Sequence, residues 1–253
     1  MPTRRYKCII AYDGTNYAGW QVQPGKVTVQ GALEHAIECL TREQVRVFCS
    51  GRTDRGVHAK AQVVHFDIER EMRPDKLQRG INRFLQHDIR VMKAVRAKPD
   101  FDARMSATGK EYRYFIWNEP VMPPHKRLYA THVYYPLDIE KMRAAATILV
   151  GRHDFAAFSA NPGHEREGTV RSVYQLKLVK KGPEIVLTAL GEGFLFKMVR
   201  SLAGFLIRVG QGELDVEDAR RILQSRTRTA RVPTADPQGL FLWRVYYGKL
   251  PDS

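Results

Sequence analysis

The order of strand-like and helix-like hydrophobic patterns is the feature that most restricts the fold of this chain. Within residues 1–97, four segments with alternating or β-branched residues predict strands, at 4–11, 44–50, 61–69 and 89–97. An amphipathic helix is expected at 29–41, with Thr28 as its N-cap, and another at 75–84, directly after Pro74. The first part of the chain is therefore predicted to be β-α-β-β-α-β.

The rest of the chain repeats this order. Strands are expected at 111–117, 170–179, 184–190 and 240–247, and helices at 194–209, at 216–224 and directly after Asp138. The loop at 159–169 is too polar to pack. The repeat predicts an α+β fold of two ferredoxin-like β-α-β-β-α-β lobes, residues 1–105 and 106–253, forming one mainly antiparallel sheet with flanking helices.

Charge indicates the kind of partner. Lys and Arg number 41 against 27 Asp and Glu, which gives a net charge of +14 and an isoelectric point near 9.8. A field of this size attracts polyanions such as nucleic acid, although a basic surface without any partner is the simpler alternative. Five arginines gather near the C-terminus: Arg220, Arg221, Arg226, Arg228 and Arg231. No long amphipathic segment joins them to a strong apolar face, so a membrane surface is the less favoured partner.

The sequence also bears on the compartment. No run of about 18 apolar residues is present, and the N-terminus has no apolar signal stretch. The three cysteines, Cys8, Cys39 and Cys49, are scattered and form no Cys-x-x-Cys pair. A reducing cytoplasm is the compartment that fits these features.

One loop carries an unusual group of charges. The segment Ser50-Gly-Arg-Thr-Asp-Arg-Gly-Val-His-Ala59 places the carboxylate of Asp54 among Arg52, Arg55 and His58. Positive neighbours favour the ionised form of a carboxylate, and a positioned, ionised aspartate acts as a nucleophile or a base. The alternative is that Asp54 is only a turn former. The glycine spacing resembles a phosphate-binding loop, but Val57 and His58 replace the Lys and Ser/Thr that such a loop needs.

Two other positions could contribute to a site. Tyr112 and Tyr114 fall on the same face of a strand, where they are either core aromatics or a stacking platform for a base. Arg200 lies in an apolar helix, so its guanidinium either reaches water or pairs with an acid such as Asp54. The histidines and cysteines have no metal-site spacing, and no dinucleotide fingerprint or nucleophile elbow is present.

Seven blocks in one order resemble the bacterial tRNA pseudouridine synthase A family over nearly the whole chain. These blocks are residues 12–24, 28–34, 51–59 with 62–66, 101–107 with 112–114, 151–155, 198–204 and 239–242. The most specific of them is Gly51-Arg-Thr-Asp-Arg-Gly-Val-His-Ala59. The resemblance implies the pseudouridine synthase fold. Two positions depart from the family pattern: Arg55 replaces a residue that is often small, and Asp236 interrupts an Ala-Pro pair.

The resemblance also implies an activity and roles for residues. The family cleaves the N-glycosidic bond of a uridine in tRNA, turns the base and rejoins it through C5, at positions 38, 39 and 40 of the anticodon arm. It needs no metal or organic cofactor and acts as a homodimer. Asp54 is expected to be the catalytic nucleophile, Tyr112 to stack on the target base, and Arg200 to pair with Asp54. Arg52, Arg55 and His58 are expected to contact the RNA. The alternatives are a synthase of this family that modifies another RNA, and a non-catalytic RNA-binding protein.

The charge predicts strong salt dependence of tRNA binding. If about six phosphates are contacted, affinity should fall roughly 10³-fold between about 50 and 200 mM salt, because each contact releases counterions. Filter binding across a salt series measures this slope. A flat response would contradict electrostatic binding and leave catalysis untested.

Overall fold

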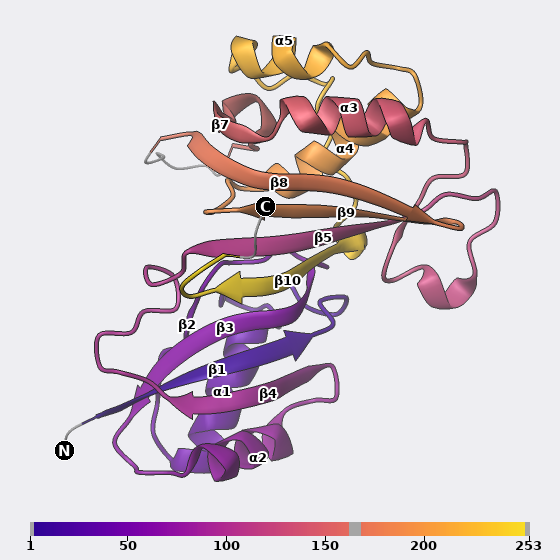
Figure 1. The fold of residues 1–253 in the computed structure, drawn as a ribbon. Coiled ribbons are helices and arrows are strands. Elements are labelled where there is room, and N and C mark those ends of the chain that lie inside the picture. Colours follow the sequence, from indigo (N-terminus) through magenta and orange to yellow (C-terminus); the bar gives the residue numbers. More distant parts are fainter. Residues whose placement is uncertain (1–2, 162–167, 251–253) are drawn as a thin grey trace. The chain divides into compact units, whose positions relative to one another are not determined.

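The computed structural model describes residues 3–161 and 168–250 of the chain. Part of the polar loop 159–169 thus lies outside the described residues. The described chain contains ten strands, paired mostly antiparallel, and five α-helices, which confirms the predicted α+β class (Figure 1). Among these residues, every helix is too short or too polar to span a lipid bilayer.

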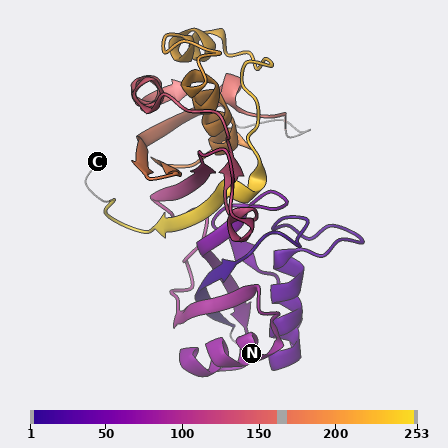
Figure 2. The ribbon, with the colours of Figure 1, turned by 90° about the vertical axis from the view of Figure 1, so that its right-hand side faces the viewer.

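The chain divides into two compact units, and the first comprises residues 1–108 together with 241–249. Its elements are β1 (Arg4–Tyr12), α1 (Val29–Thr41), β2 (Phe48–Cys49), β3 (His58–Ile68), α2 (Pro74–Phe84), β4 (Ile89–Arg96) and nearly all of β10 (Leu240–Tyr246). The strands are ordered β4-β1-β3, and β2 also pairs with β3. This is the order of a ferredoxin-like unit, as predicted for this part of the chain. Figure 2 shows α1 lying along these strands.

The last strand belongs to this first unit. β10 runs parallel to β3, with Phe241 opposite His58 and Leu242 opposite Ala59. The two-lobe prediction counted residues 240–247 with the second lobe. This pairing between β10 and β3 lies at the start of β3, directly after the loop that carries Asp54.

The second unit comprises residues 109–240 with Leu250 among the described residues. Its elements are β5 (Gly109–Trp117), β6 (Thr131–His132), α3 (Ile139–Ile148), β7 (Gly151–Asp154), β8 (Val170–Lys181), β9 (Glu184–Gly191), α4 (Met198–Gly210) and α5 (Asp218–Ser225). Strands are ordered β5-β9-β8-β7. In Figures 1 and 2, α5 lies beyond α3 and α4 as seen from the strands.

Local hydrogen bonds explain where the predicted elements begin and end. The N-caps Thr28 and Asp138 accept backbone N–H groups as expected, from Gly31 in α1 and from Lys141 in α3. The strand predicted at 44–50 is only Phe48–Cys49 in the structure. The reason is that the backbone groups of Val47 bond to side chains of α1 and not to a neighbouring strand. The Glu34 carboxylate accepts the Val47 N–H at 2.9 Å, and the Gln30 side-chain amide donates to the Val47 carbonyl at 3.2 Å.

Two predicted boundaries shift for other reasons. Helix α4 begins at Met198 rather than at residue 194, because Lys197 has a left-handed backbone with φ of 58°. Strand β3 begins at His58 rather than at residue 61, because β10 gives residues 58 and 59 a pairing partner. Neither change alters the order of the elements.

A bidentate ion pair between Arg5 and Asp67 joins β1 to β3. The Arg5 guanidinium donates from Nε to Asp67 Oδ1 at 2.9 Å and from Nη2 to Asp67 Oδ2 at 2.7 Å. The hydrogen bond from Arg5 lowers the pKa of Asp67 and outweighs the opposing effect of burial. A lowered folded-state pKa stabilises the fold above the unfolded pKa and loses that effect as the pH falls through the folded value.

We therefore expect Asp67→Asn to reduce the free energy of unfolding at pH 7 by about 1 kcal/mol or less, because the pair is partly exposed. The difference from the parent should disappear on acidification below the pKa of Asp67. Urea unfolding at several pH values measures this. The control is Glu119→Gln, an exposed carboxylate without an ion pair in the part of the chain described; an equal loss there would contradict a specific role of the pair.

Candidate active site

The loop that carries Asp54 is fixed to β3 where it begins. The Ser50 N–H donates to the Val63 carbonyl at 2.8 Å, and the Ser50 hydroxyl donates to Gln62 Oε1 at 2.7 Å. The Gln62 amide donates in turn to the Gly51 carbonyl at 2.6 Å. Ser50 and Gln62 have no exposed surface. Buried and mutually satisfied polar groups of this kind hold a backbone in one conformation.

The middle of the loop is held by the last residue of β1 and by a residue that follows this strand. The hydroxyls of Tyr12 and Thr53 lie 2.8 Å apart, and the Trp20 N–H donates to the Thr53 carbonyl at 3.0 Å. The next residue, Asp54, begins a turn that is closed by the Val57 N–H on the Asp54 carbonyl at 3.1 Å. Asp54 is half-buried, whereas Arg52 and Arg55 beside it are exposed. A carboxylate is thus presented by a backbone that is hydrogen-bonded on either side of it.

His58, the first residue of β3, holds the end of the loop that carries Asp54. Its Nδ1 accepts the Gly14 N–H at 3.0 Å and lies 3.2 Å from Asp13 Oδ1. The ring is 0% exposed and stacks on Phe241, with 4.5 Å between ring centroids.

Gly14 is needed because two backbones approach closely. A Cβ at Gly14 would lie 2.0 Å from the Val57 carbonyl oxygen, which is impossible without movement of the loop. The segment after β1 is itself anchored, since the Tyr17 hydroxyl donates to Asp88 Oδ1 at 2.6 Å. Burial and this hydrogen bond raise the pKa of Tyr17, so the phenol stays a donor.

The second unit contains the tyrosines considered above. Tyr112 on β5 is 8% exposed, and its ring meets Phe194 edge-on with 5.4 Å between centroids. Tyr114 is fully buried, where its hydroxyl contacts the Thr131 hydroxyl and donates to the Asp236 carbonyl at 2.9 Å. Burial raises the pKa of Tyr114. The prediction that both tyrosines lie on one face is confirmed, and Tyr114 is a structural residue.

Arg200 lies in the first turn of α4 and holds the segment before β10. Its Nε donates to the Ala235 carbonyl at 2.8 Å, and the Ala235 N–H donates back to the Arg200 carbonyl at 3.1 Å. Close packing continues at Gly204, where a Cβ would lie 2.4 Å from the Pro233 carbonyl oxygen. Asp54 belongs to the first unit and Arg200 and Tyr112 to the second, so their meeting remains a prediction.

The arginines near the C-terminus are engaged within the second unit. Arg221 and Arg231 both pair with Asp218, at 3.1 and 2.7 Å, and Arg220 and Arg226 pair with Glu217 and Asp154. Arg228 donates to the Ser201 hydroxyl, the Val232 carbonyl and the Thr234 hydroxyl. Arg228 therefore holds the segment after α5, whereas the four ion-paired arginines keep between 50% and 72% of their side chains exposed.

Comparison with known proteins identifies the family. A family model described as tRNA pseudouridine synthase matches residues 8–105 and 145–248. The chain is 43% identical to a tRNA pseudouridine synthase A of Brevibacillus brevis over 96% of this chain and 100% of the relative. It is 42% identical to that of Listeria welshimeri, over 96% of this chain and 99% of the relative. The chain belongs to the tRNA pseudouridine synthase family.

The structure adds a role for one residue of this synthase. The His58 ring has no exposed surface in the structure, and its contact with RNA stays a prediction. The ring fixes the distance between the Asp54 loop and the turn after β1. Arg52 and Arg55 are exposed on the same loop and remain expected to contact RNA. Among the described residues, no three His, Cys, Asp or Glu side chains are arranged to hold a metal ion.

Several residues that hold the Asp54 loop in this synthase could not be identified from the chemistry of their side chains. Tyr12, Thr53 and Gln62 have ordinary side chains, and their partners are distant in sequence. The only sequence signal was that all three lie within the family-like blocks 12–24 and 51–59 with 62–66.

We predict that His58→Ala reduces kcat about 10- to 100-fold with little change in KM for tRNA, because displacement of the loop misplaces Asp54. His58→Asn should recover part of the rate, since its Oδ1 can also accept the Gly14 N–H. Steady-state kinetics on an unmodified tRNA transcript measures both.

The matched control is His65→Asn at the other end of β3. His65 is 3% exposed, and its Nδ1 accepts the Ala103 N–H at 3.0 Å. It should destabilise the protein to a similar extent and leave kcat unchanged. Equal losses of kcat in the two variants would show that only general stability is affected.

Proposed function

We propose that this protein converts uridine to pseudouridine at positions 38, 39 and 40 in the anticodon stem-loop of tRNA, with Asp54 as the catalytic carboxylate. The observation that carries the proposal is the loop itself: Asp54 is half-buried between exposed Arg52 and Arg55, on a backbone held by buried hydrogen bonds. Rigid support of this kind is what a reacting group needs. The names of the relatives support tRNA as the substrate.

The carboxylate also distinguishes catalysis from binding alone. A protein that only binds RNA gains nothing from an anionic side chain between two arginines, since it repels phosphates and weakens their combined field. An enzyme that opens the glycosidic bond needs an anion close to C1′ or C6 of the uridine. Asp54 is the proposed anion, whether it attacks the sugar, attacks the base or removes a proton. The neighbouring arginines stabilise its charge and hold the RNA.

The second unit supplies the remaining proposed groups. The uridine leaves its stack, which requires a few kcal/mol, and Tyr112 offsets part of this by stacking on the base. Arg200 pairs with Asp54. Its Nε bond to the Ala235 carbonyl supports this role because it limits rotation of the guanidinium. We further propose a homodimer that acts in the cytoplasm, where tRNA is available.

The test is position-resolved mass spectrometry of an unmodified tRNA transcript after incubation with the protein. We expect pseudouridine at positions 38 to 40 with the parent and none with Asp54→Asn, which keeps the shape of the side chain and removes its charge. The control is Asp75→Asn, a partly exposed and ion-paired aspartate on α2, which should retain full activity.

Several outcomes would contradict the proposal. Pseudouridine formed by Asp54→Asn would exclude Asp54 as the catalytic carboxylate. Pseudouridine at other tRNA positions, or only in another RNA, would replace the proposed substrate site. Intact binding without any product would favour the binding-protein alternative. Sedimentation equilibrium tests the dimer, which has twice the 29.0 kDa of one chain.

A further inference from the structure

A lysine on the face of the first unit away from its helices has unusual surroundings. Tyr6, Cys8 and Ile10 of β1 are buried, so Lys7 between them projects from the opposite face of the strand. Its ammonium lies 3.8 Å from the ring centroid of Tyr247 and 4.8 Å from that of Phe101. Two aromatic rings thus fix the position of a half-buried cation.

Lys7 has no carboxylate to neutralise it. In the part of the chain that the structure describes, no Asp or Glu forms an ion pair with its ammonium. Burial lowers the pKa of Lys7, and the charge of Lys93 lowers it further. Residues of opposite charge would normally accompany a cation at such a position. The arrangement is therefore unfavourable until an anion binds there.

An open pocket of about 300 Å³ lies beside the ammonium. It is lined by Lys7, Arg96, Lys98, Asp100, Phe101 and Ser106, among others. The charge of Arg96 is partly balanced, since its guanidinium lies 3.7 Å from Glu71 and also donates to the Tyr6 hydroxyl at 3.2 Å. Lys7 and Lys98 then face a single carboxylate, that of Asp100. The pocket has room for a phosphate group and its sugar, and an excess of positive charge.

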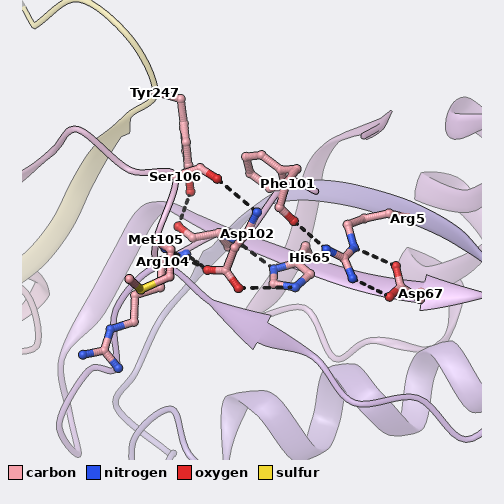
Figure 3. A network of polar contacts seen from close by, with 10 residues as sticks. Arg5, His65, Asp67, Phe101, Asp102, Arg104, Met105, Ser106 and Tyr247 are labelled. Carbon is pink, nitrogen blue, oxygen red and sulfur yellow. Dashed lines mark hydrogen bonds and ion pairs between the residues drawn. The ribbon is translucent and has the colours of Figure 1, made fainter. Parts of the chain in front are cut away.

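The wall of this pocket is held rigid by the network in Figure 3. Arg5 donates to the Phe101 carbonyl at 2.9 Å, and the Tyr247 hydroxyl donates to the Ala103 carbonyl at 2.6 Å. His65 of β3 accepts the Ala103 N–H. The Asp102 carboxylate closes the turn by accepting backbone N–H groups at 2.7 and 2.8 Å.

The outer side of the same turn is exposed. Arg104 extends away from the network in Figure 3, and Met105 is 80% exposed, the highest value among the large hydrophobic residues of the described chain. A cation and an apolar side chain on a rigid turn match the phosphates and bases of a polynucleotide. The turn that follows Phe101 of the pocket thus adds groups suited to contact with RNA.

We propose that the Lys7 pocket binds a backbone phosphate of the RNA substrate, away from the nucleotide that is modified. This inference rests on the proposed function for the identity of the RNA. Lys7 and Tyr12, whose hydroxyl contacts the Asp54 loop, are five residues apart on β1, which is about 17 Å at 3.4 Å per residue. The contact therefore contributes to affinity and orientation of the RNA and not to the chemical step.

The test compares Lys7→Met with the parent. Methionine keeps an unbranched side chain against the rings of Phe101 and Tyr247 and removes the charge. We expect the Kd for unmodified tRNA to rise about 10-fold, and the slope of log K against log salt to fall by about 1, as for one lost phosphate contact. The single-turnover rate with saturating protein should stay within about 2-fold of the parent, because Asp54 is remote. Fluorescence anisotropy and quenched-flow sampling give these values.

Two further variants separate charge from folding. Lys76→Met removes an exposed lysine from α2 in the same unit and should change neither Kd nor slope. Lys7→Arg keeps a cation and should bind tRNA within about 3-fold of the parent. Loss of affinity in Lys7→Arg equal to that in Lys7→Met, with a lower melting temperature in both, would show a packing effect and overturn the proposal.

Three other results would decide between the Lys7 site and its alternatives. Unchanged Kd and slope in Lys7→Met would overturn the site while leaving pseudouridine formation in place. A change in sedimentation mass without a change in Kd would assign the pocket to a second copy of the chain and also overturn it. If the parent makes no pseudouridine but its RNA affinity still depends on Lys7, the site stands and the proposed function fails.

Discussion

The structure of the candidate site depends on the hydrogen bond between the Gly14 backbone and the ring of His58. It joins the end of β1 to the start of β3 at the point where the loop with Asp54 returns to the sheet. The contact is possible only because Gly14 has no side chain to meet the Val57 carbonyl and because Phe241 of β10 covers the ring. Three segments that are far apart in sequence thus fix one loop. The Tyr12–Thr53 and Ser50–Gln62 bonds then hold the loop on either side of Asp54.

A similar hydrogen bond, from a backbone N–H to a buried histidine, occurs at the other end of β3. His65 also accepts a backbone N–H at Nδ1, from Ala103, and also contacts an aspartate, Asp102, at 3.8 Å. Burial lowers the pKa of His65, which favours the neutral ring that this hydrogen bond requires. One strand therefore supports two functional loops through two buried histidines, one at the proposed catalytic carboxylate and one at the proposed phosphate pocket. In both cases the buried histidine holds a backbone N–H in place.

Several arginines use part of the net positive charge for contacts within the protein. Arg5, Arg200 and Arg228 donate to carbonyl or side-chain groups inside their own unit, and the other C-terminal arginines have carboxylate partners. A guanidinium has five donors in a fixed plane, so it can cross-link several backbone segments at once. Lys7, by contrast, is a half-buried lysine that forms no ion pair with a carboxylate in the described chain, and it is isolated in sequence between Tyr6 and Cys8.

The sequence by itself determined the order of the helices and the longer strands, without the short strands β6 and β7. It also determined the caps at Thr28 and Asp138, the loop that carries Asp54 and the family. These depend on residues close together in the chain, or on blocks whose order is visible without folding. Only the tertiary structure decided that residues 44–47 do not form a strand, that β10 covers His58, that His58 is buried and that the C-terminal arginines are paired. Each of these results from a contact between residues distant in sequence. Periodicity reports which face of an element is apolar, but it does not report which polar group another segment brings to that face.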